Sequence, residues 1–368
     1  MKFSCEKFVL LNAVNSAIKA VSNKTSMNVL ECLHISANEL ITISGFDLNM
    51  GIKTTFDANI YEKGEFLINA KLFSEILRKL PEEEITITVT KDLKAKIVCG
   101  KSIFDLIAID ASEFPEIPTV EKLKYFQIKS QTLREIINQT KFARSDNESK
   151  LIHTGFLFEI TDDQLTVVAV DGYRLALRRE KLAMHTMENT SFVIPGNSLI
   201  ELEKLLDEND VYIYLDKKHI LFEINNIILT TRLIDGEFLN YKAAIPTDFT
   251  STITCDISSL KKAIDRVSLI ISEKIKNPIR FSFENNILKL SCITTIGRSY
   301  DEYYFDGEIE DLEIGFNNKY ILDALNACPE DEATLSLKGA LSPVIITPKD
   351  GSDHFVYLIL PVRLKNNE

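Results

Sequence analysis

The sequence predicts an α+β protein that is built from three copies of one small domain. The first observation is a segment of 20 residues that occurs three times without a gap, at 3–22, 126–145 and 253–272. Each copy opens with a short apolar strand. It continues with residues at i, i+3, i+4 and i+7 that are apolar apart from Thr140, and this spacing forms one face of an α-helix. The copies begin 123 and 127 residues apart, which is the length of a small domain and too long for a solenoid repeat.

The second observation is a further strand–helix unit that follows at a similar offset in each third. These units begin at Glu65, Ser191 and Leu312. Any strand before an amphipathic helix has this pattern, so a single pair would mean little, but three ordered pairs favour a repeated domain. We therefore expect domains at 1–120, 125–246 and 252–368, each long enough to bury its own core.

The composition is typical of a globular protein, with 45% hydrophobic and 26% charged residues in 368. No run of 18 apolar residues occurs, and the first residues, MKFSCEKF, have no apolar stretch behind their charge. We expect neither a membrane span nor a secretory signal, and a cytoplasmic location. Six scattered cysteines form no Cys-x-x-Cys pair, so we expect buried apolar thiols rather than disulfides or metal ligands.

The first third is expected to hold two helices and a run of half-buried strands. The second helix, at 70–80, must end before Pro81. Residues 84–90 alternate strictly between apolar and polar side chains, as a strand buried on one face does. Strands are expected, in order, at 32–36, 40–45, 50–56, 84–90, 94–99 and 102–109. The segment 113–120 has two prolines and no periodicity, and we expect a linker there.

The other two thirds repeat this plan. In the second, a polar loop at 145–150 follows the first helix, and a linker is expected at 245–251. Its expected strands are 155–160, 165–170, 174–178, 211–215, 219–224 and 227–233. Those of the last third are 280–283, 288–292, 299–304, 334–337, 344–347 and 355–360, with a helix from Asn317. The helices are apolar on one face, so they must lie on one side of antiparallel sheets, whose other face is outward or against a neighbour.

The charge is distributed unevenly. The six helical stretches with their trailing loops are 7–24, 70–80, 131–150, 197–206, 257–276 and 317–327. They carry 17 Lys and Arg against nine Asp and Glu, a net charge of +8, so the remainder carries −20 of the total of −12. Lysine and arginine favour helices in general, but so does glutamate, which is the minority here. The asymmetry favours a polyanion that faces the helices.

Several motifs suggest catalysis or ligand binding and fail on their spacing. Gly100-Lys101-Ser102 lacks the glycine that a phosphate-binding loop needs five residues earlier. A serine-hydrolase set at Ser16 and Lys19, 145–147 and 153–155 places its second and third motifs too close together to line opposite walls of a cleft. The five histidines have no partner at metal-ligand spacing, and no carboxylates form a recognisable acid/base pair. We expect no catalytic residues, no metal and no cofactor.

Two features indicate a binding surface instead. Asp171-Gly172 forms a tight-turn dipeptide, after which Tyr173 and Arg174 project. The C-terminal stretch 357–364 stays apolar up to its end, which is unusual for a chain terminus. We expect this last strand to leave the edge of its sheet and to form one lip of a groove.

Six motifs then carry a resemblance to a known family. They are Met1-Lys2-Phe3 before the long helix, Asp47-Leu48 after Gly45, Val170 to Ala176, Leu233 to Phe238, Ile314 to Asn317, and Leu360 to Leu364. Together they resemble the bacterial DNA polymerase III β subunits, the sliding clamps, over the whole chain. The resemblance implies three clamp-type domains, each of two helices packed on antiparallel sheets, in a head-to-tail dimeric ring. It also implies duplex DNA in the hole, held without sequence specificity.

The family's peptide pocket takes short hydrophobic tails of the polymerase catalytic subunit, the clamp loader and repair proteins. By resemblance, it would be lined here by His153, Val170, Gly172, Tyr173, Arg174, Leu175, Leu239, Ala243, Ala244, Asn317, Tyr320, Leu341, Pro343, Leu358, Leu360, Pro361, Val362 and Arg363. His153, Leu239 and Ala243 stand where the family has leucine, proline and a basic residue. We therefore expect an altered preference among peptides of the same class.

The resemblance also implies a dimer interface and a set of DNA-facing residues. The interface would place Phe104 and Leu106 against Leu269 and Ile270 of the partner. The DNA-facing candidates are Lys24, Lys71, Arg78, Arg134, Lys150 and Lys204. The family's aromatic pair before Gly155 is replaced by Leu151 and Ile152, which removes the rings needed to stack on single-stranded ends.

One alternative remains open beside the sliding clamp. A three-domain scaffold of the same fold class could bind peptides or another polyanion without encircling DNA. A chain that fails to form a closed dimer would favour this scaffold. The serine hydrolase is the weaker rival, and a β-lactam probe that acylates Ser16 would support it.

Overall fold

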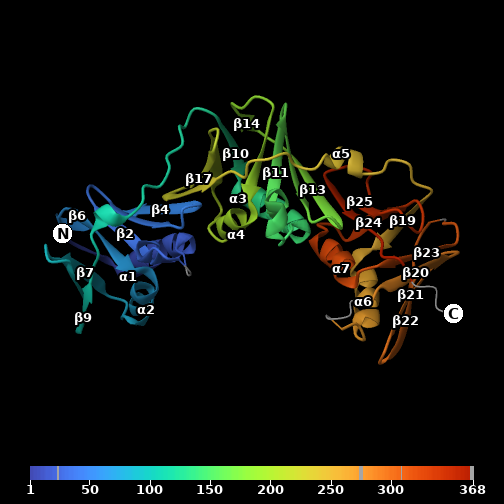
Figure 1. Ribbon diagram of the computed structural model, residues 1–368, viewed down its shortest axis with the longest axis horizontal. Helices are drawn as coiled ribbons and strands as arrows, with labels where there is room; N and C mark the ends of the chain where they lie inside the picture. The colour runs from blue at the N-terminus through green and yellow to red at the C-terminus, as the bar shows by residue number, and fades with distance from the viewer. Residues whose placement is uncertain (23–24, 273–276, 308, 365–368) are drawn as a thin grey trace. The chain divides into compact units, whose positions relative to one another are not determined.

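The computed structural model describes residues 1–22, 25–272, 277–307 and 309–364. By its internal contacts the chain forms two compact units. The first unit comprises Met1–Thr132, Ala183–Met187 and Asn197–Leu233, and the second comprises Leu133–Leu182, Glu188–Gly196 and the chain from Ile234 onward. Each unit therefore contains one outer repeat and part of the middle one (Figure 1).

The first unit contains two antiparallel sheets. The five-stranded sheet has the order β5 (Asn59–Glu62), β1 (Lys2–Glu6), β7 (Glu84–Val89), β8 (Lys94–Cys99) and β9 (Ser102–Ile107). The nine-stranded sheet has the order β14 (Met184–His185), β10 (Tyr125–Lys129), β16 (Asp210–Leu215), β17 (His219–Ile224), β18 (Ile227–Arg232), β4 (Met50–Phe56), β3 (Ile41–Phe46), β2 (Cys32–Ala37) and β6 (Gly64–Asn69). The β18–β4 ladder joins strands of the first and second repeats.

The second unit also contains two antiparallel sheets. The eight-stranded sheet has the order β15 (Thr190–Pro195), β11 (Gly155–Thr161), β12 (Gln164–Val170), β13 (Arg174–Lys181), β26 (Phe355–Ile359), β25 (Val344–Pro348), β24 (Glu332–Leu337) and β19 (Ser251–Asp256). The four-stranded sheet has the order β22 (Gly297–Tyr304), β21 (Ile287–Thr294), β20 (Ile279–Glu284) and β23 (Leu312–Phe316). Here the β13–β26 ladder joins the second and third repeats.

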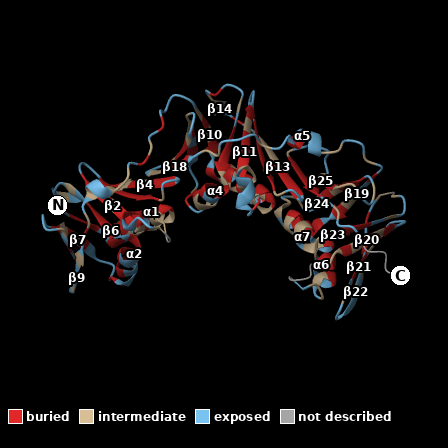
Figure 2. Cartoon of the chain, in the orientation of Figure 1, coloured by how far each residue is buried: buried red, intermediate tan, exposed pale blue. Residues whose placement is uncertain are grey.

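The expected helices are confirmed. They are α1 (Lys7–Ala17), α2 (Ala70–Lys79), α3 (Ser130–Thr140), α4 (Gly196–Glu203), α6 (Ile257–Ser268) and α7 (Asn318–Ala327), while α5 (Tyr241–Ala244) was not expected. Short 3-10 turns lie at η1 (Ile18–Ala20), η2 (Asn28–Glu31), η3 (Ala111–Glu113), η4 (Lys141–Ala143) and η5 (Glu148–Thr154). The helices bury the predicted apolar face, for example Leu10, Val14 and Ala17 of α1. Buried residues accordingly concentrate along the strands and on one side of each helix (Figure 2).

Local contacts explain where α2 begins and ends. The Asn69 side chain accepts a hydrogen bond from the Leu72 amide at 3.0 Å and caps the first turn. After the last turn, the buried Lys7 ammonium donates to the Leu80 carbonyl at 2.6 Å and to Glu82 at 2.7 Å. A cation placed at a helix C-terminus satisfies a free carbonyl and the negative end of the helix dipole. This contact also fixes α1 against α2.

The position of the C-terminal strand corrects the expectation from the sequence. We expected this strand at the edge of its sheet, but β26 lies between β13 and β25. All five residues of β26, Phe355–Ile359, are buried, so the strand is covered on both faces. The first part of the run that we interpreted as an exposed lip thus belongs to an interior strand, whereas Leu360 and Val362 beyond it are exposed.

The face of this sheet away from α7 is covered from within the chain. Its residues include Leu157, Leu177 and Val356, and they form one apolar cluster with Tyr241. The partly buried residues packed on this cluster are Ile152, Ile234, Phe238, Ile245 and Phe249. The connecting segment 234–249 therefore covers this face. We had expected the face to be open to solvent or packed against a neighbour.

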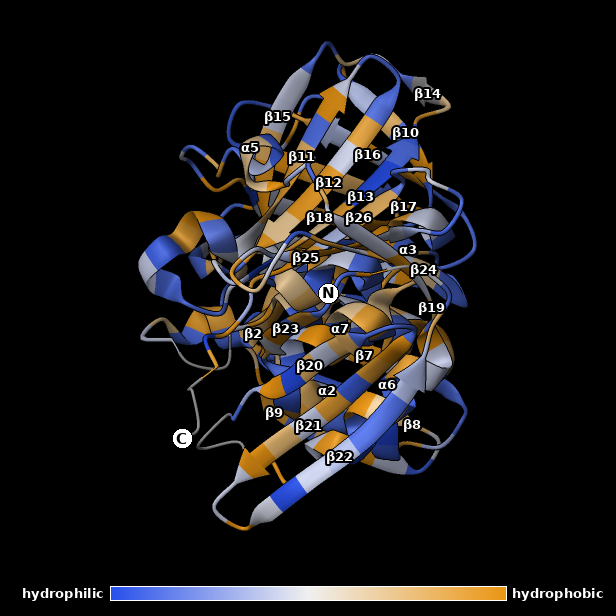
Figure 3. Cartoon of the chain, turned by 90° about the vertical axis from the view of Figure 1, so that its right-hand side faces the viewer, coloured by the Kyte–Doolittle hydropathy of each residue, from blue (hydrophilic) through white to orange (hydrophobic). Residues whose placement is uncertain are grey.

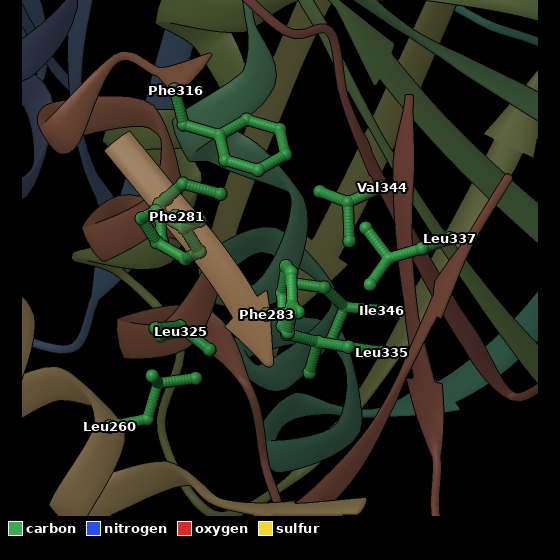
Figure 4. A pocket seen from close by; sticks show the side chains of 10 residues that line it. Leu260, Phe281, Phe283, Phe316, Leu325, Leu335, Leu337, Val344 and Ile346 are labelled. Carbon is green, nitrogen blue, oxygen red and sulfur yellow. The ribbon is translucent and has the colours of Figure 1, made fainter. Parts of the chain in front are cut away.

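The core of the last repeat contains a small apolar cavity (Figure 4). It lies between the four-stranded sheet, the helices α6 and α7, and the strands β24 and β25. Its lining residues are Leu260, Phe281, Phe283, Phe316, Ile321, Leu325, Leu335, Leu337, Val344 and Ile346. No polar side chain lines it, so it is a packing defect rather than a ligand site.

Candidate functional site

The turn between β12 and β13 has the geometry that its sequence predicts. The Asp171 carboxylate accepts hydrogen bonds from the backbone amides of Tyr173 at 2.9 Å and Arg174 at 3.1 Å. Gly172 adopts φ +93°, in the left-handed region that glycine tolerates best. The turn is thus fixed by its own residues, and it leaves Tyr173 61% exposed.

Arg174 is the central ionic contact of this site. Its side chain is 9% exposed, and it lies on the face of β13 that meets α7. Nε donates to Asp171 at 2.9 Å, and a terminal nitrogen donates to Asp323 of α7 at 2.6 Å. The guanidinium carbon lies 4.4 Å from the centre of the Tyr320 ring. Two carboxylates and an aromatic face together compensate a charge that burial would otherwise penalise.

The C-terminal segment after β26 closes around the same turn. The Leu360 amide donates to the Tyr173 carbonyl at 2.8 Å, and the Val362 amide donates to the Gly315 carbonyl at 2.8 Å. The rings of Tyr173 and Tyr320 stack with centroids 6.0 Å apart. Strand pairing and these contacts therefore bring residues from the middle of the chain next to its last residues.

The candidate pocket residues divide into buried and exposed groups. Val170, Leu175 and Leu358 lie in the covered apolar cluster and form a floor. The exposed members are Gly172, Tyr173, Leu239, Ala243, Ala244, Leu341, Leu360, Val362 and Arg363. His153, Asn317, Tyr320, Pro343 and Pro361 are partly buried, and the Asn317 side chain caps α7.

The short helix α5, which was not expected from the sequence, contains two of the exposed candidates, Ala243 and Ala244. The Tyr241 hydroxyl donates to Glu159 of β11 at 2.6 Å, and the Lys242 ammonium lies 3.0 Å from the same carboxylate. Burial and this hydrogen bond raise the pKa of Tyr241. The Asn240 side chain caps the helix by accepting from the Ala243 amide. An asparagine three residues before an alanine pair is the available signal, but four residues carry no helical periodicity.

The DNA-facing candidates lie on both units. Lys71, Arg78, Lys150 and Lys204 are exposed and Arg134 is partly buried, while Lys24 lies outside the described residues. In the first unit, Arg78 and Lys204 lie near Lys19 of η1, which we did not single out as a DNA contact. Burial lowers the pKa of Lys19, the charge of Glu201 opposes that shift, and Lys204 and Arg78 add to it. Basic residues from three helices thus lie close together.

Three of the four candidate interface residues are partly buried, and the fourth, Leu269, is exposed. Phe104 and Leu106 of β9 are half-buried and pack against the core of the first unit. The exposed apolar residues of that strand are Ile103 and Ile107, at 56% and 87%. Exposure alternates along β9 in the structure, but residues 102–107 do not alternate between polar and apolar side chains, so no signal in the sequence indicates this difference. In the second unit, Leu269 is 83% exposed and Ile270 is partly buried.

Within residues 1–22, 25–272, 277–307 and 309–364, no group of three or more His, Cys, Asp or Glu side chains is placed to hold a metal ion. None of the helices described is long and apolar enough to cross a membrane.

Comparisons with known proteins agree along the whole chain. The N-terminal, central and C-terminal domain models of the DNA polymerase III beta subunit match residues 1–118, 127–240 and 242–363. The beta sliding clamp of Bacillus subtilis is 34% identical over 378 residues, covering 99% of this chain and 100% of that protein. The clamp of Staphylococcus aureus strain N315 is 30% identical, with 99% of each chain covered.

Solved structures give the same result. A putative beta subunit from Eubacterium rectale matches with a TM-score of 0.95 at 35% identity, covering 98% of this chain and 99% of that chain. The sliding clamp of Bacillus subtilis matches with a TM-score of 0.96 at 33% identity, covering 99% and 100%. A Pseudomonas aeruginosa clamp, solved bound to griselimycin, matches with a TM-score of 0.93 at 25% identity, covering 99% of this chain and 100% of that chain. With all three domain models matched in order, this chain belongs to the DNA polymerase III beta subunit family, the beta sliding clamps.

Proposed function

We propose that two copies of this chain join head to tail in a ring around duplex DNA and tether a polymerase there. The observation that carries the proposal is a pair of edge strands, β9 in the first unit and β22 in the second. Each pairs on one side only among the residues described. An edge strand presents unpaired backbone donors and acceptors that a strand of another chain can bind. Pairing β9 of one copy with β22 of the other, twice, closes a two-fold ring.

Side chains at these two edges support the same pairing. Ile103 and Ile107 of β9 and Leu269 after α6 are large exposed apolar residues that a partner would cover. Most of the charges are opposite in sign, with Asp105 of β9 and Arg298 of β22 as exceptions. Exposed lysines lie at Lys94, Lys96 and Lys101 around β8 and β9, and acidic residues lie at Asp301 and Glu302 of β22. Complementary charge favours contact between the two different edges over contact of either edge with itself.

The basic helices provide the surface for DNA. We assign phosphate contacts to Lys19, Lys71, Arg78 and Lys204 of the first unit and to Arg134 and Lys150 of the second. Lys24 remains a prediction from the sequence. Such contacts read charge and not base sequence, as a clamp that slides requires. Leu151 and Ile152 offer no aromatic ring for stacking on single strands.

The surface around Tyr173, Tyr320, Leu360 and Val362 is our candidate for the peptide-binding pocket. It would bind short hydrophobic tails of the polymerase catalytic subunit, the clamp loader and repair proteins. Exposed apolar residues beside a rigid turn suit an extended, apolar ligand. In this role the chain is a processivity subunit in the cytoplasm and performs no chemistry itself.

Light scattering tests the ring. The wild type should have a mass in solution of twice the 41.7 kDa of one chain. The double variant Leu269→Ala, Ile270→Ala should have a mass closer to that of a single chain. Ile107→Asp, on the other edge, should do the same, because a charge would be buried at the interface. Leu123→Ala, at an exposed position just before β10, is the matched control and should remain dimeric. A wild type that is monomeric at micromolar concentration would favour the non-encircling scaffold instead.

A further inference from the structure

His153 lies at the end of η5, immediately before β11, and borders the candidate pocket. Its ring meets the ring of Phe238 edge-on, with centroids 5.9 Å apart and an interplanar angle of 67°. Phe238 in turn packs on the apolar cluster that contains Val170 and Leu175. The imidazole is therefore part of the wall that adjoins the pocket floor.

The imidazole nitrogens of His153 have no hydrogen-bond partner among the described residues. Its backbone carbonyl accepts a hydrogen bond from the Ser145 amide at 3.1 Å. A neutral imidazole has one donor and one acceptor nitrogen. The half-buried ring thus offers polar atoms to a ligand on a surface that is otherwise apolar.

The charges around His153 include one cation, Lys150, that is unpaired within the described part of the chain. Burial lowers the pKa of His153, Lys150 lowers it further, and Asp171 opposes both. The Asp171 carboxylate is already hydrogen-bonded by two backbone amides and by Arg174. The segment that carries Phe238 adds Asp235 and Glu237, whose side chains are exposed. Of the two charges that act on the ring, Asp171 is therefore already paired, while Lys150 has no partner among the described residues and attracts a negative group.

We infer that His153 determines peptide specificity by selecting an acidic side chain, aspartate or glutamate, at the peptide position against it. The inference rests on the proposed peptide-binding function. A carboxylate can accept a hydrogen bond from the neutral ring and, when the ring is protonated, a stronger charge-assisted one. A leucine side chain at that position would bury the ring nitrogens without a partner, which is unfavourable.

The two kinds of peptide should respond to pH in opposite directions. An acidic peptide raises the pKa of His153 when it binds, so binding takes up a proton and strengthens as the pH falls through the pKa of the complex. An apolar peptide buries the ring further and lowers its pKa, so its binding weakens as the pH falls. The glutamate of the peptide stays ionised above about pH 5.5, since its own pKa is about 4.3.

The test is fluorescence anisotropy with the full-length chain and labelled eight-residue peptides of leucine, phenylalanine and serine. Each position in turn carries either glutamate or leucine. At one position we expect glutamate to bind about three- to tenfold more tightly than leucine at pH 6. This preference should shrink at pH 8.

Two variants of His153 serve as matched controls. His153→Leu should reverse the preference to leucine. His153→Gln keeps a hydrogen-bonding side chain that cannot be protonated, so it should retain a weaker preference for glutamate and lose the pH dependence. Thermal melting of both variants, together with binding of the all-leucine peptide, shows whether the pocket is intact.

The outcomes separate this inference from the function on which it rests. If leucine peptides bind the wild type and both variants equally and no position prefers glutamate, the inference is overturned and the pocket stands. If no peptide binds any form of the chain, the proposed pocket fails, and the inference fails with it. A glutamate preference that survives in His153→Leu would assign the selection to another residue and also overturn it.

Discussion

Replacing Asp323 by alanine removes one of the two carboxylates that hold the buried Arg174 guanidinium. The lost contact is a 2.6 Å charge-assisted hydrogen bond to a side chain that is 9% exposed. Breaking a fully buried ion pair costs about 3–5 kcal/mol, and one hydrogen bond to a charged group contributes about 1.5–3 kcal/mol. Asp171 remains in place, and Asp323 is itself 29% exposed. We therefore expect the lower range, a loss of about 1.5–3 kcal/mol in the free energy of unfolding of the second unit.

A double-mutant cycle isolates the contact. Arg174→Met keeps the apolar stem and removes the charge, after which Asp323 can be hydrated and Asp171 still accepts from two backbone amides. Asp323→Ala should then cost little in the Arg174→Met background, with a coupling of about 1–2 kcal/mol. The Tyr320 cation–π contact contributes to the cost of Arg174→Met alone, because Asp323→Ala leaves it intact.

Urea unfolding followed by circular dichroism measures these changes. Hydrogen exchange at α7 and β13 assigns them to the second unit, since a chain of two units need not unfold in one step. Asp353→Ala is the matched control, because its partner Arg179 and the carboxylate lie near the surface, and it should cost less than about 1 kcal/mol. Additive effects of the two changes, within about 0.5 kcal/mol, would refute the assigned role of the contact.

Three further predictions concern other parts of the chain. Lys19→Gln should weaken duplex DNA binding and reduce by about one the slope of log affinity against log salt concentration, because it removes one phosphate contact. Lys2→Gln on β1 should change neither quantity, and salt titrations of binding measure both. Leu335→Ala should enlarge the cavity of the last repeat and lower stability by about 2–5 kcal/mol in urea unfolding, whereas the exposed Leu341→Ala should cost under about 0.5 kcal/mol. Asp256 caps α6, and hydrogen bonds from the Ser259 side chain and amide lower the pKa of its carboxyl group. The stability that this carboxylate gives the folded chain should be complete above the usual carboxyl pKa and should disappear as the pH falls through the lowered pKa. Asp256→Ala should lower the free energy of unfolding by about 0.5–2 kcal/mol at neutral pH and should reduce its decrease at acid pH. An unchanged decrease at acid pH would contradict this assignment.

Much of the fold could be predicted because the patterns are local. The helices bury the spaced apolar residues that defined them, and α2 ends before the proline that was expected to stop it. The three-domain clamp fold expected from the resemblance is confirmed by the family models and the solved structures. Short elements such as β14, with two residues, and α5, with four, were not predicted, because so few residues show no periodicity.

The site depended on contacts that no local pattern shows. The position that we predicted for the C-terminal strand was wrong, because five apolar residues in a row fit both an exposed lip and a strand buried on both faces. The pairing of Arg174 with Asp323 joins residues 149 apart in the chain, and their charges alone give no hint of it. Turn chemistry, in contrast, was readable at Asp171 and Gly172, because their roles depend on neighbouring backbone atoms only. The assignments of pocket, DNA-facing and interface residues remain predictions.

The two ladders that join neighbouring repeats, β18–β4 and β13–β26, bear on how the chain responds to a cut. Figure 3 shows β13 beside β26. A protease that cleaves the linker at 113–120 breaks one covalent bond but leaves the β18–β4 ladder and its buried residues intact. The fragments should therefore remain together under native conditions and part only in denaturant. The middle repeat expressed alone would in turn expose the open edges of β18 and β13, which makes it prone to aggregate. The repeat is thus a unit of sequence, while each compact unit of the structure combines one outer repeat with part of the middle one.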